Sequence, residues 1–180
     1  LGLVARALVF EGAARGADRR EEVARLLARL DDLRSPGATG SGWGYPFDWE
    51  TRTGTFRAET PMITTDPYVY EAFSQVHAID HNPKWLRIMQ SIAGHVFKGY
   101  RDEASGPNAS SCAYTPTPES PTGVINASAY RAFQLTKAGV ELSRNEYLDV
   151  ARRNLNFVLS TQQRDGSWPY AVDGVRDFID

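Results

Sequence analysis

Two carboxylates flank a tryptophan in the first third of the chain, a pattern typical of sites that act on sugars. Asp48 and Glu50 stand on either side of Trp49 in the stretch GWGYPFDWE. Glycosidic chemistry needs one protonated and one ionised carboxyl group, placed among apolar rings. The alternative is that these loop acids accept hydrogen bonds from nearby backbone N–H groups. We therefore take Asp48 and Glu50 as catalytic candidates and leave that alternative open.

Two further acids lie at the start of a predicted helix. Asp66 precedes Pro67, and this pair is typical of a helix N-terminus, with Asp66 as the N-cap. Glu71 lies one turn further along the same helix, which is otherwise apolar. A carboxylate in such surroundings needs a partner or a function. Asp66 and Glu71 join the catalytic candidates.

Tryptophan and tyrosine recur at matching positions in two loops. Trp43 and Trp168 each follow the predicted start of a helix by 24 residues, within the similar stretches GWGYP and GSWPY. Such aromatic residues either fix the loop by burial or stack against sugar rings. Asn126 either caps a helix or binds a hydroxyl group. The candidate substrate-binding residues are Trp43, Tyr45, Trp49, Tyr68, Asn126, Trp168 and Tyr170.

Hydrophobic spacing predicts the helices that must position these residues. The six helices are expected at about 3–14, 19–33, 67–79, 83–99, 126–140 and from 144 onward. They form pairs, and the second members start 64 and 61 residues apart, which indicates stacked helical hairpins. First members are apolar over most of their circumference and second members have one apolar stripe, which predicts an inner and an outer layer. We predict an all-α single domain spanning residues 1–180.

Long connections separate the hairpins, at about residues 35–65 and 100–125, whereas connections within a hairpin are short. Long loops in a compact domain are usually functional. Both would emerge beside the N-termini of the inner helices, which carry partial positive charge. This end is therefore expected to hold an anionic or hydroxyl-rich ligand.

The C-terminal motif carries a family resemblance. The pattern of Phe157, Val158, Gln162, Gly166 and Trp168 resembles the QW repeat of terpenoid cyclases, which are α/α toroids. Similar endings occur in protein prenyltransferases and in carbohydrate-active toroids such as six-hairpin glycosidases. With its GWGYPFDW and NFVLSTQQRDGSWPY stretches, the chain most resembles bacterial α/α-toroid proteins associated with polysaccharide biosynthesis. The resemblance implies five to seven hairpins, so we expect a partial toroid of about three, truncated at both ends.

These observations favour a domain that binds or processes an oligosaccharide or polysaccharide. If it is an enzyme, a hydrolase, lyase or epimerase is expected. Two alternatives stay open: a toroid that binds an isoprenoid, and a non-catalytic helical-repeat scaffold. A partial ring would also expose apolar inner helices, which predicts self-association.

Composition also indicates which other kinds of partner, such as nucleic acid, membrane or metal, are expected. With 20 basic and 22 acidic residues the net charge is −2, so no nucleic-acid partner is expected. No run approaches the roughly 20 apolar residues of a membrane helix, so no membrane insertion is expected. His77 and His81 are spaced like two metal ligands on a helix but have no third, and Cys112 is the single cysteine. We therefore expect no metal or cofactor, and, because no signal peptide is visible, a cytoplasmic location.

Overall fold

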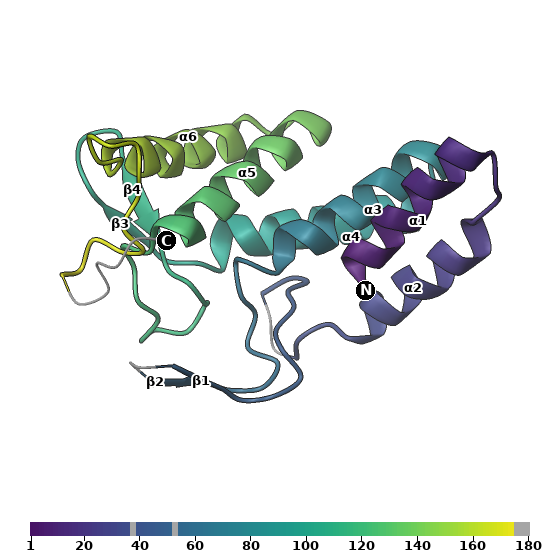
Figure 1. Ribbon diagram of the computed structural model, residues 1–180, viewed down its shortest axis with the longest axis horizontal. Helices are drawn as coiled ribbons and strands as arrows, with labels where there is room; N and C mark the ends of the chain where they lie inside the picture. The colour runs from purple at the N-terminus through teal and green to yellow at the C-terminus, as the bar shows by residue number, and fades with distance from the viewer. Residues whose placement is uncertain (37–38, 52–53, 175–180) are drawn as a thin grey trace.

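The computed structural model describes residues 1–36, 39–51 and 54–174, and these residues form six helices and four short strands (Figure 1). The helices are α1 (Gly2–Arg15), α2 (Arg20–Asp32), α3 (Asp66–Asp80), α4 (Pro83–Lys98), α5 (Ile125–Glu141) and α6 (Asn145–Ser160). The strands are β1 (Trp49–Thr51), β2 (Gly54–Phe56), β3 (Asp102–Ala104) and β4 (Ser110–Cys112). The chain is thus mostly helical, as predicted, and each of the two long connections contains in addition a short antiparallel strand pair.

The helices form three consecutive hairpins, α1–α2, α3–α4 and α5–α6, and neighbouring hairpins pack through α1 on α3 and through α5 on α3 and α4. Figure 1 shows the first hairpin at one end of the molecule, the third at the other and the second between them. The turn residues His81 and Ser143, 62 positions apart, both adopt a positive φ, at 51° and 54°. The predicted hairpin repeat is therefore present in three dimensions.

The outer helix α4 buries the apolar stripe that its sequence predicts. In α4, Asn82 caps the N-terminus by accepting a hydrogen bond from the Lys84 N–H (2.9 Å), and Pro83 occupies the first helical position. The stripe itself is buried: Trp85, Ile88, Met89, Ile92 and Val96. Among the described residues, no helix is long and apolar enough to cross a membrane.

The inner helices are not equivalent. On α3, Tyr70 and Phe73 are fully buried, and α5 buries Leu135 and Ala138. By contrast, α1 exposes Leu3, Val4 and Phe10 although it is apolar around most of its circumference. The apolar composition of α1 therefore does not correspond to burial in this chain.

The β1–β2 hairpin extends away from the helical layers (Figure 1). Its strands are antiparallel, with Trp49 opposite Phe56 and Glu50 opposite Thr55. Because side chains alternate between the faces of a strand, Trp49 and Phe56 share one face and Glu50 and Thr55 share the other. This arrangement sets the geometry of the candidate site.

Candidate functional site

Five aromatic side chains gather around the β1–β2 hairpin, and we call this group the aromatic platform: Tyr45, Phe47, Trp49, Phe56 and Tyr114. The ring centroids of Trp49 and Phe56 are 5.6 Å apart, and Tyr114 packs on both, at 6.3 and 5.9 Å. Tyr45 meets Trp49 edge-on at 5.9 Å and stacks on Phe47 at 5.4 Å, with ring planes 7° apart. Three separate segments of the chain therefore build one aromatic surface.

The platform has a buried base and an exposed edge. Tyr114 is buried, and Trp49 and Phe56 are partly buried against the core. Tyr45 and Phe47 are 38% and 57% exposed. Stacked rings held by a packed base offer a flat apolar surface at low conformational-entropy cost.

A polar cavity of about 350 Å³ adjoins the platform at Phe56. Hydroxyl groups from both long connections line it, together with one basic and one acidic side chain: Thr51, Thr55, Thr60, Thr117, Ser120, Arg57 and Glu119. The size falls within the range of small-molecule sites, about 300–1,000 Å³. Hydroxyl, guanidinium and carboxylate groups together donate and accept hydrogen bonds, which suits a polyhydroxylated ligand.

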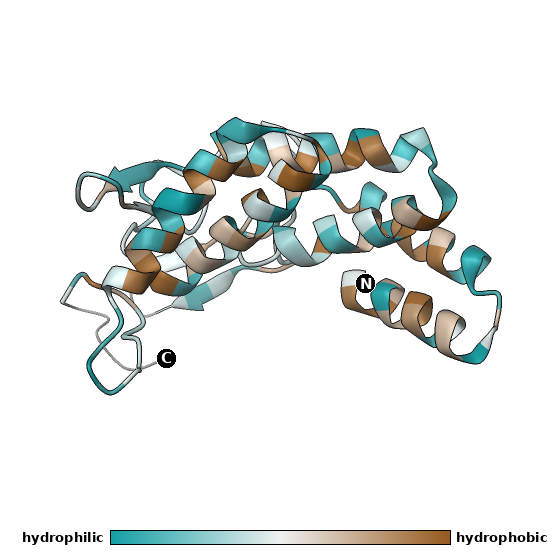
Figure 2. Cartoon of the chain, turned by 90° about the horizontal axis from the view of Figure 1, so that it is seen from above, coloured by the Kyte–Doolittle hydropathy of each residue, from teal (hydrophilic) through white to brown (hydrophobic). Residues whose placement is uncertain are grey.

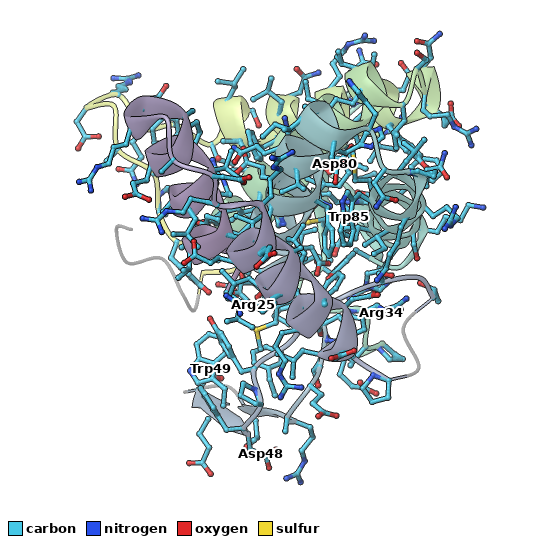
Figure 3. All side chains as sticks on the ribbon, turned by 90° about the vertical axis from the view of Figure 1, so that its right-hand side faces the viewer. Arg25, Arg34, Asp48, Trp49, Asp80 and Trp85 are labelled. Carbon is cyan, nitrogen blue, oxygen red and sulfur yellow. The ribbon has the colours of Figure 1, made fainter. Side chains whose placement is uncertain are left out.

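Asp48 closes the open end of the hairpin. Its carboxylate accepts hydrogen bonds from the Ala58 backbone N–H and from Arg57 Nη1, both at 2.7 Å. The pKa of Asp48 is lowered mainly by the hydrogen bond from the Ala58 backbone and next by the one from Arg57, so the carboxyl group is ionised at neutral pH. Glu50 is exposed on the strand face opposite Trp49. Figure 3 shows Asp48 and Trp49 on the hairpin, away from Asp80 and Trp85 on the helices.

Asp66 lies in a different environment, fully buried at the start of α3. It accepts hydrogen bonds from the Trp43 backbone N–H (3.1 Å) and the Tyr100 hydroxyl (2.9 Å). Burial raises the pKa of Asp66 to about 7, against the opposing effect of both hydrogen bonds. The expected N-cap role was wrong, because Thr65 occupies that position and the Asp66 carboxylate binds distant groups. Because Asp66 has no exposed surface, its carboxylate is out of reach of a bound substrate.

The remaining acid and Tyr68 connect inner helices. Glu71 forms an ion pair with Arg6 of α1 at 2.5 Å. The Tyr68 hydroxyl lies 2.8 Å from that of Tyr130 on α5. The four candidate acids thus lie in three separate places. Asp48 and Glu50 are on the β1–β2 hairpin, Asp66 is in the core, and Glu71 is at the contact between α1 and α3.

The two repeated tryptophans occupy equivalent places. Trp43 Nε1 donates to the Leu30 carbonyl (2.7 Å) and Trp168 Nε1 to the Val158 carbonyl (2.8 Å). Each acceptor is two residues before the end of an outer helix, past the last regular helical hydrogen bond, and it also accepts from the residue that ends the helix. The Leu30 carbonyl accepts from the Leu33 N–H (3.1 Å), and the Val158 carbonyl from the N–H and hydroxyl of Thr161 (3.3 and 2.8 Å). Trp43 is 3% exposed, which favours the structural interpretation at this position.

In the middle hairpin, the side chain that donates to the equivalent carbonyl is Arg131 from the next hairpin. It is fully buried on α5, and its Nε donates to the Val96 carbonyl at 2.9 Å, again two residues before the helix end. Its Nη2 donates to the Phe97 carbonyl (2.9 Å), and Nη1 lies 2.7 Å from Asp102 Oδ1. The last-turn carbonyl, as we call this acceptor, is therefore satisfied in all three hairpins.

The last two candidates lie near the C-terminal loop. The Tyr170 carbonyl accepts a hydrogen bond from the Ile125 N–H (3.0 Å) at the start of α5. In the first turn of that helix, Asn126 Oδ1 is buried and accepts no hydrogen bond from the described residues. Gln162 donates to the Gly166 carbonyl (2.9 Å), which fixes the turn before Trp168.

Three members of the platform were not among the residues predicted from the sequence: Phe47, Phe56 and Tyr114. The alternation of Tyr45, Phe47 and Trp49 at every second residue was a signal, since it places all three on one side of extended chain. Nothing local indicated Tyr114, which comes from the loop after β4.

No protein-family model, curated protein or solved structure matches the chain. Within residues 1–36, 39–51 and 54–174, no group of three or more His, Cys, Asp and Glu side chains is arranged to hold a metal ion.

Proposed function

We propose that the chain is a carbohydrate-binding domain of the α/α-toroid type, and that the aromatic platform and adjoining polar cavity form its sugar site. The observation that carries the proposal is the exposed, stacked Tyr45–Phe47 pair on a platform of aromatic rings whose other end, at Phe56, lines a cavity rich in hydroxyl groups. A sugar has apolar ring faces and hydrogen-bonding edges, and this surface offers partners for both.

The acids favour binding over glycoside cleavage. A two-carboxylate mechanism needs a protonated acid and an ionised partner on either side of the scissile bond. Asp48 is ionised, and Asp66, the one with a raised pKa, has no exposed surface. Glu50 is the remaining carboxylate on the hairpin, and it lies on the face opposite Trp49. We therefore place recognition, not bond breaking, at the platform.

The three hairpins, the inner and outer helices and the repeated last-turn carbonyl support the toroid assignment. A role in bacterial polysaccharide biosynthesis rests on the resemblance of the loop sequences alone. An oligosaccharide is accordingly the ligand class to test first.

Calorimetric titration with neutral and acidic oligosaccharides tests the proposal. We expect Phe47→Ala to weaken binding about tenfold, because a lost ring contact is worth about 1.4 kcal/mol. Phe10→Ala is the matched control, since Phe10 is 60% exposed on α1 and Phe47 is 57% exposed on the platform. The proposal is overturned if no glycan binds, or if both variants bind as the unaltered chain does.

A second cavity favours the isoprenoid alternative. It measures about 640 Å³ and lies among α1, α2, α3 and α4, with mostly apolar walls that include Leu8, Val9, Val23, Val76 and Trp85. Such a volume is sufficient for a branched hydrocarbon chain. Prenyl alcohols and diphosphates in the same titrations distinguish the two functions, because Phe47→Ala should not affect their binding.

A further inference from the structure

The two long connections supply the sugar site proposed above, and both are bonded to one buried carboxyl group. The connection between α2 and α3 carries Tyr45, Phe47 and the β1–β2 hairpin, and the connection between α4 and α5 carries Tyr114 and one wall of the cavity. Figure 2 shows the most hydrophobic residues largely on the helices, whereas the strands of the connections are mainly hydrophilic or intermediate in colour. The position of the connections therefore depends on hydrogen bonds as well as on apolar packing.

One oxygen of Asp66 holds the first connection through its backbone. The Trp43 N–H donates to Asp66 Oδ1 at 3.1 Å. Beyond this point the segment is paired with the residues that precede α3. The Met62 N–H donates to the Trp43 carbonyl (3.1 Å), and the Glu59 N–H donates to the Tyr45 carbonyl (2.6 Å). Backbone pairing thus extends from the bond to Asp66 as far as the first member of the exposed aromatic pair.

The other oxygen of Asp66 holds the second connection. Asp66 Oδ2 accepts a hydrogen bond from the Tyr100 hydroxyl at 2.9 Å, two residues after the end of α4. The carbonyl of the next residue, Arg101, accepts from the Ala113 N–H at 2.8 Å. Ala113 directly precedes Tyr114, the buried base of the platform. The second connection is therefore fixed to the same carboxyl group as the first.

The two connections are also bonded to each other. The Ile63 N–H donates to the Tyr114 carbonyl at 3.2 Å, three residues before Asp66. Asp66 is fully buried, so its hydrogen bonds are shielded from water, and the loss of a partner there is costly. Loss of the carboxyl group is therefore expected to loosen both connections together.

We propose that Asp66 is the positioning residue of the sugar site. Its carboxyl group fixes the exposed aromatic pair, the base of the platform and the two walls of the cavity relative to one another, without contact with the ligand. A site whose parts are held in place beforehand binds more tightly, because ordering them on binding costs free energy. The inference rests on the proposed function for its ligand, but the anchoring of the connections is measurable without one.

Hydrogen exchange of single amides, followed by NMR, tests the anchoring. In Asp66→Ala, the Met62 and Ala113 amides, one on each connection, should exchange about tenfold faster relative to amides of α6, because two buried donors have lost their acceptor. Tyr100→Phe removes one of the two hydrogen bonds and should accelerate Ala113 more than Met62. This milder variant decides the question if Asp66→Ala does not fold. Ser74→Ala is the control, since it removes a buried hydrogen bond between α3 and α5 (2.8 Å) and should change neither amide.

Ligand affinity distinguishes positioning from a merely structural role. For a glycan that the unaltered chain binds, Asp66→Ala should weaken binding about tenfold in calorimetric titration. Asp66→Asn should restore the affinity to within about twofold, because the amide keeps an acceptor for the Trp43 N–H and offers a donor to the Tyr100 oxygen. Ser74→Ala should bind as the unaltered chain does.

The results that would overturn the proposal are specific. Unchanged exchange at either connection in folded Asp66→Ala would show that the carboxyl group does not anchor both. Equal acceleration of the α6 amides would assign Asp66 to the stability of the whole fold. Unchanged glycan affinity in Asp66→Ala would remove its role in the site. If no glycan binds the unaltered chain, the proposed function fails, and the exchange rates still decide whether Asp66 anchors the two connections.

Discussion

Replacing Asp66 with asparagine should make the stability of the fold less sensitive to pH. The carboxyl group is fully buried between the Trp43 N–H and the Tyr100 hydroxyl. The asparagine side chain would keep an oxygen for the Trp43 N–H and present its amide N–H₂ to the tyrosine oxygen, which accepts as well as donates. The substitution therefore removes the ionisation with little change in shape.

The magnitude follows from the pKa of Asp66 in the two states. Burial raises the pKa from 3.8 to about 7, so the folded chain keeps this proton at pH values where the unfolded chain has released it. The stabilising contribution is complete below the unfolded pKa and is lost as the pH rises through about 7. Linkage then gives a loss of about 2.5 kcal/mol between pH 5 and pH 8. The buried His95, whose pKa is lowered to about 4 by burial, acts in the opposite sense at acidic pH.

Urea unfolding followed by circular dichroism at pH 5, 6, 7 and 8 measures this difference. The free energy of unfolding should fall with pH more steeply for the unaltered chain than for Asp66→Asn, and the contribution of His95 cancels in the comparison. Asp18→Asn is the control, because exposed Asp18 has a pKa of about 2 and is ionised throughout. Parallel pH profiles for the unaltered chain and Asp66→Asn would refute the reasoning.

Two further predictions concern buried groups. Arg131→Met should lower the free energy of unfolding by about 3–5 kcal/mol, because it leaves Asp102 and the Val96 carbonyl without their buried partner; Arg152→Met, at an exposed ion pair, should change it by less than about 1 kcal/mol in the same urea titration. The Cys112 thiol is fully buried and its pKa is raised to about 12, mainly by burial, so a thiol reagent should label it only as fast as the chain unfolds, and rapid labelling of the native protein would contradict the described core.

Periodicity was enough to predict the helices. The stripe of α4 repeats at helical spacing from Trp85 to Val96 and has Asn82 and Pro83 as a start signal, so both the existence of the helix and its buried side follow from the sequence. The β1–β2 hairpin could not be predicted in this way. Its strands are three residues each, too short for alternation to be distinguished from a loop.

The candidate site depended on contacts that sequence spacing does not encode. Asp66 was correctly placed at the start of a helix, but the partner that explains its burial, Tyr100, is 34 residues away. Glu71 was expected to need a partner, and Arg6 supplies it from a different hairpin. The exposed aromatic pair was half predicted: Tyr45 was a candidate, whereas Phe47 was not.

The source of the donor for each last-turn carbonyl affects how the domain unfolds. In the first and third hairpins the donor from outside the helix end is a tryptophan 13 or 10 residues further along the chain, in the loop that follows the helix. In the second hairpin it is Arg131, 35 residues away on α5. The hydrogen bond to the last-turn carbonyl of the second hairpin is thus made only when the third hairpin is docked, which couples the opening of α4 to that of α5. In native-state hydrogen exchange, amides of α4 and α5 should therefore share one opening free energy.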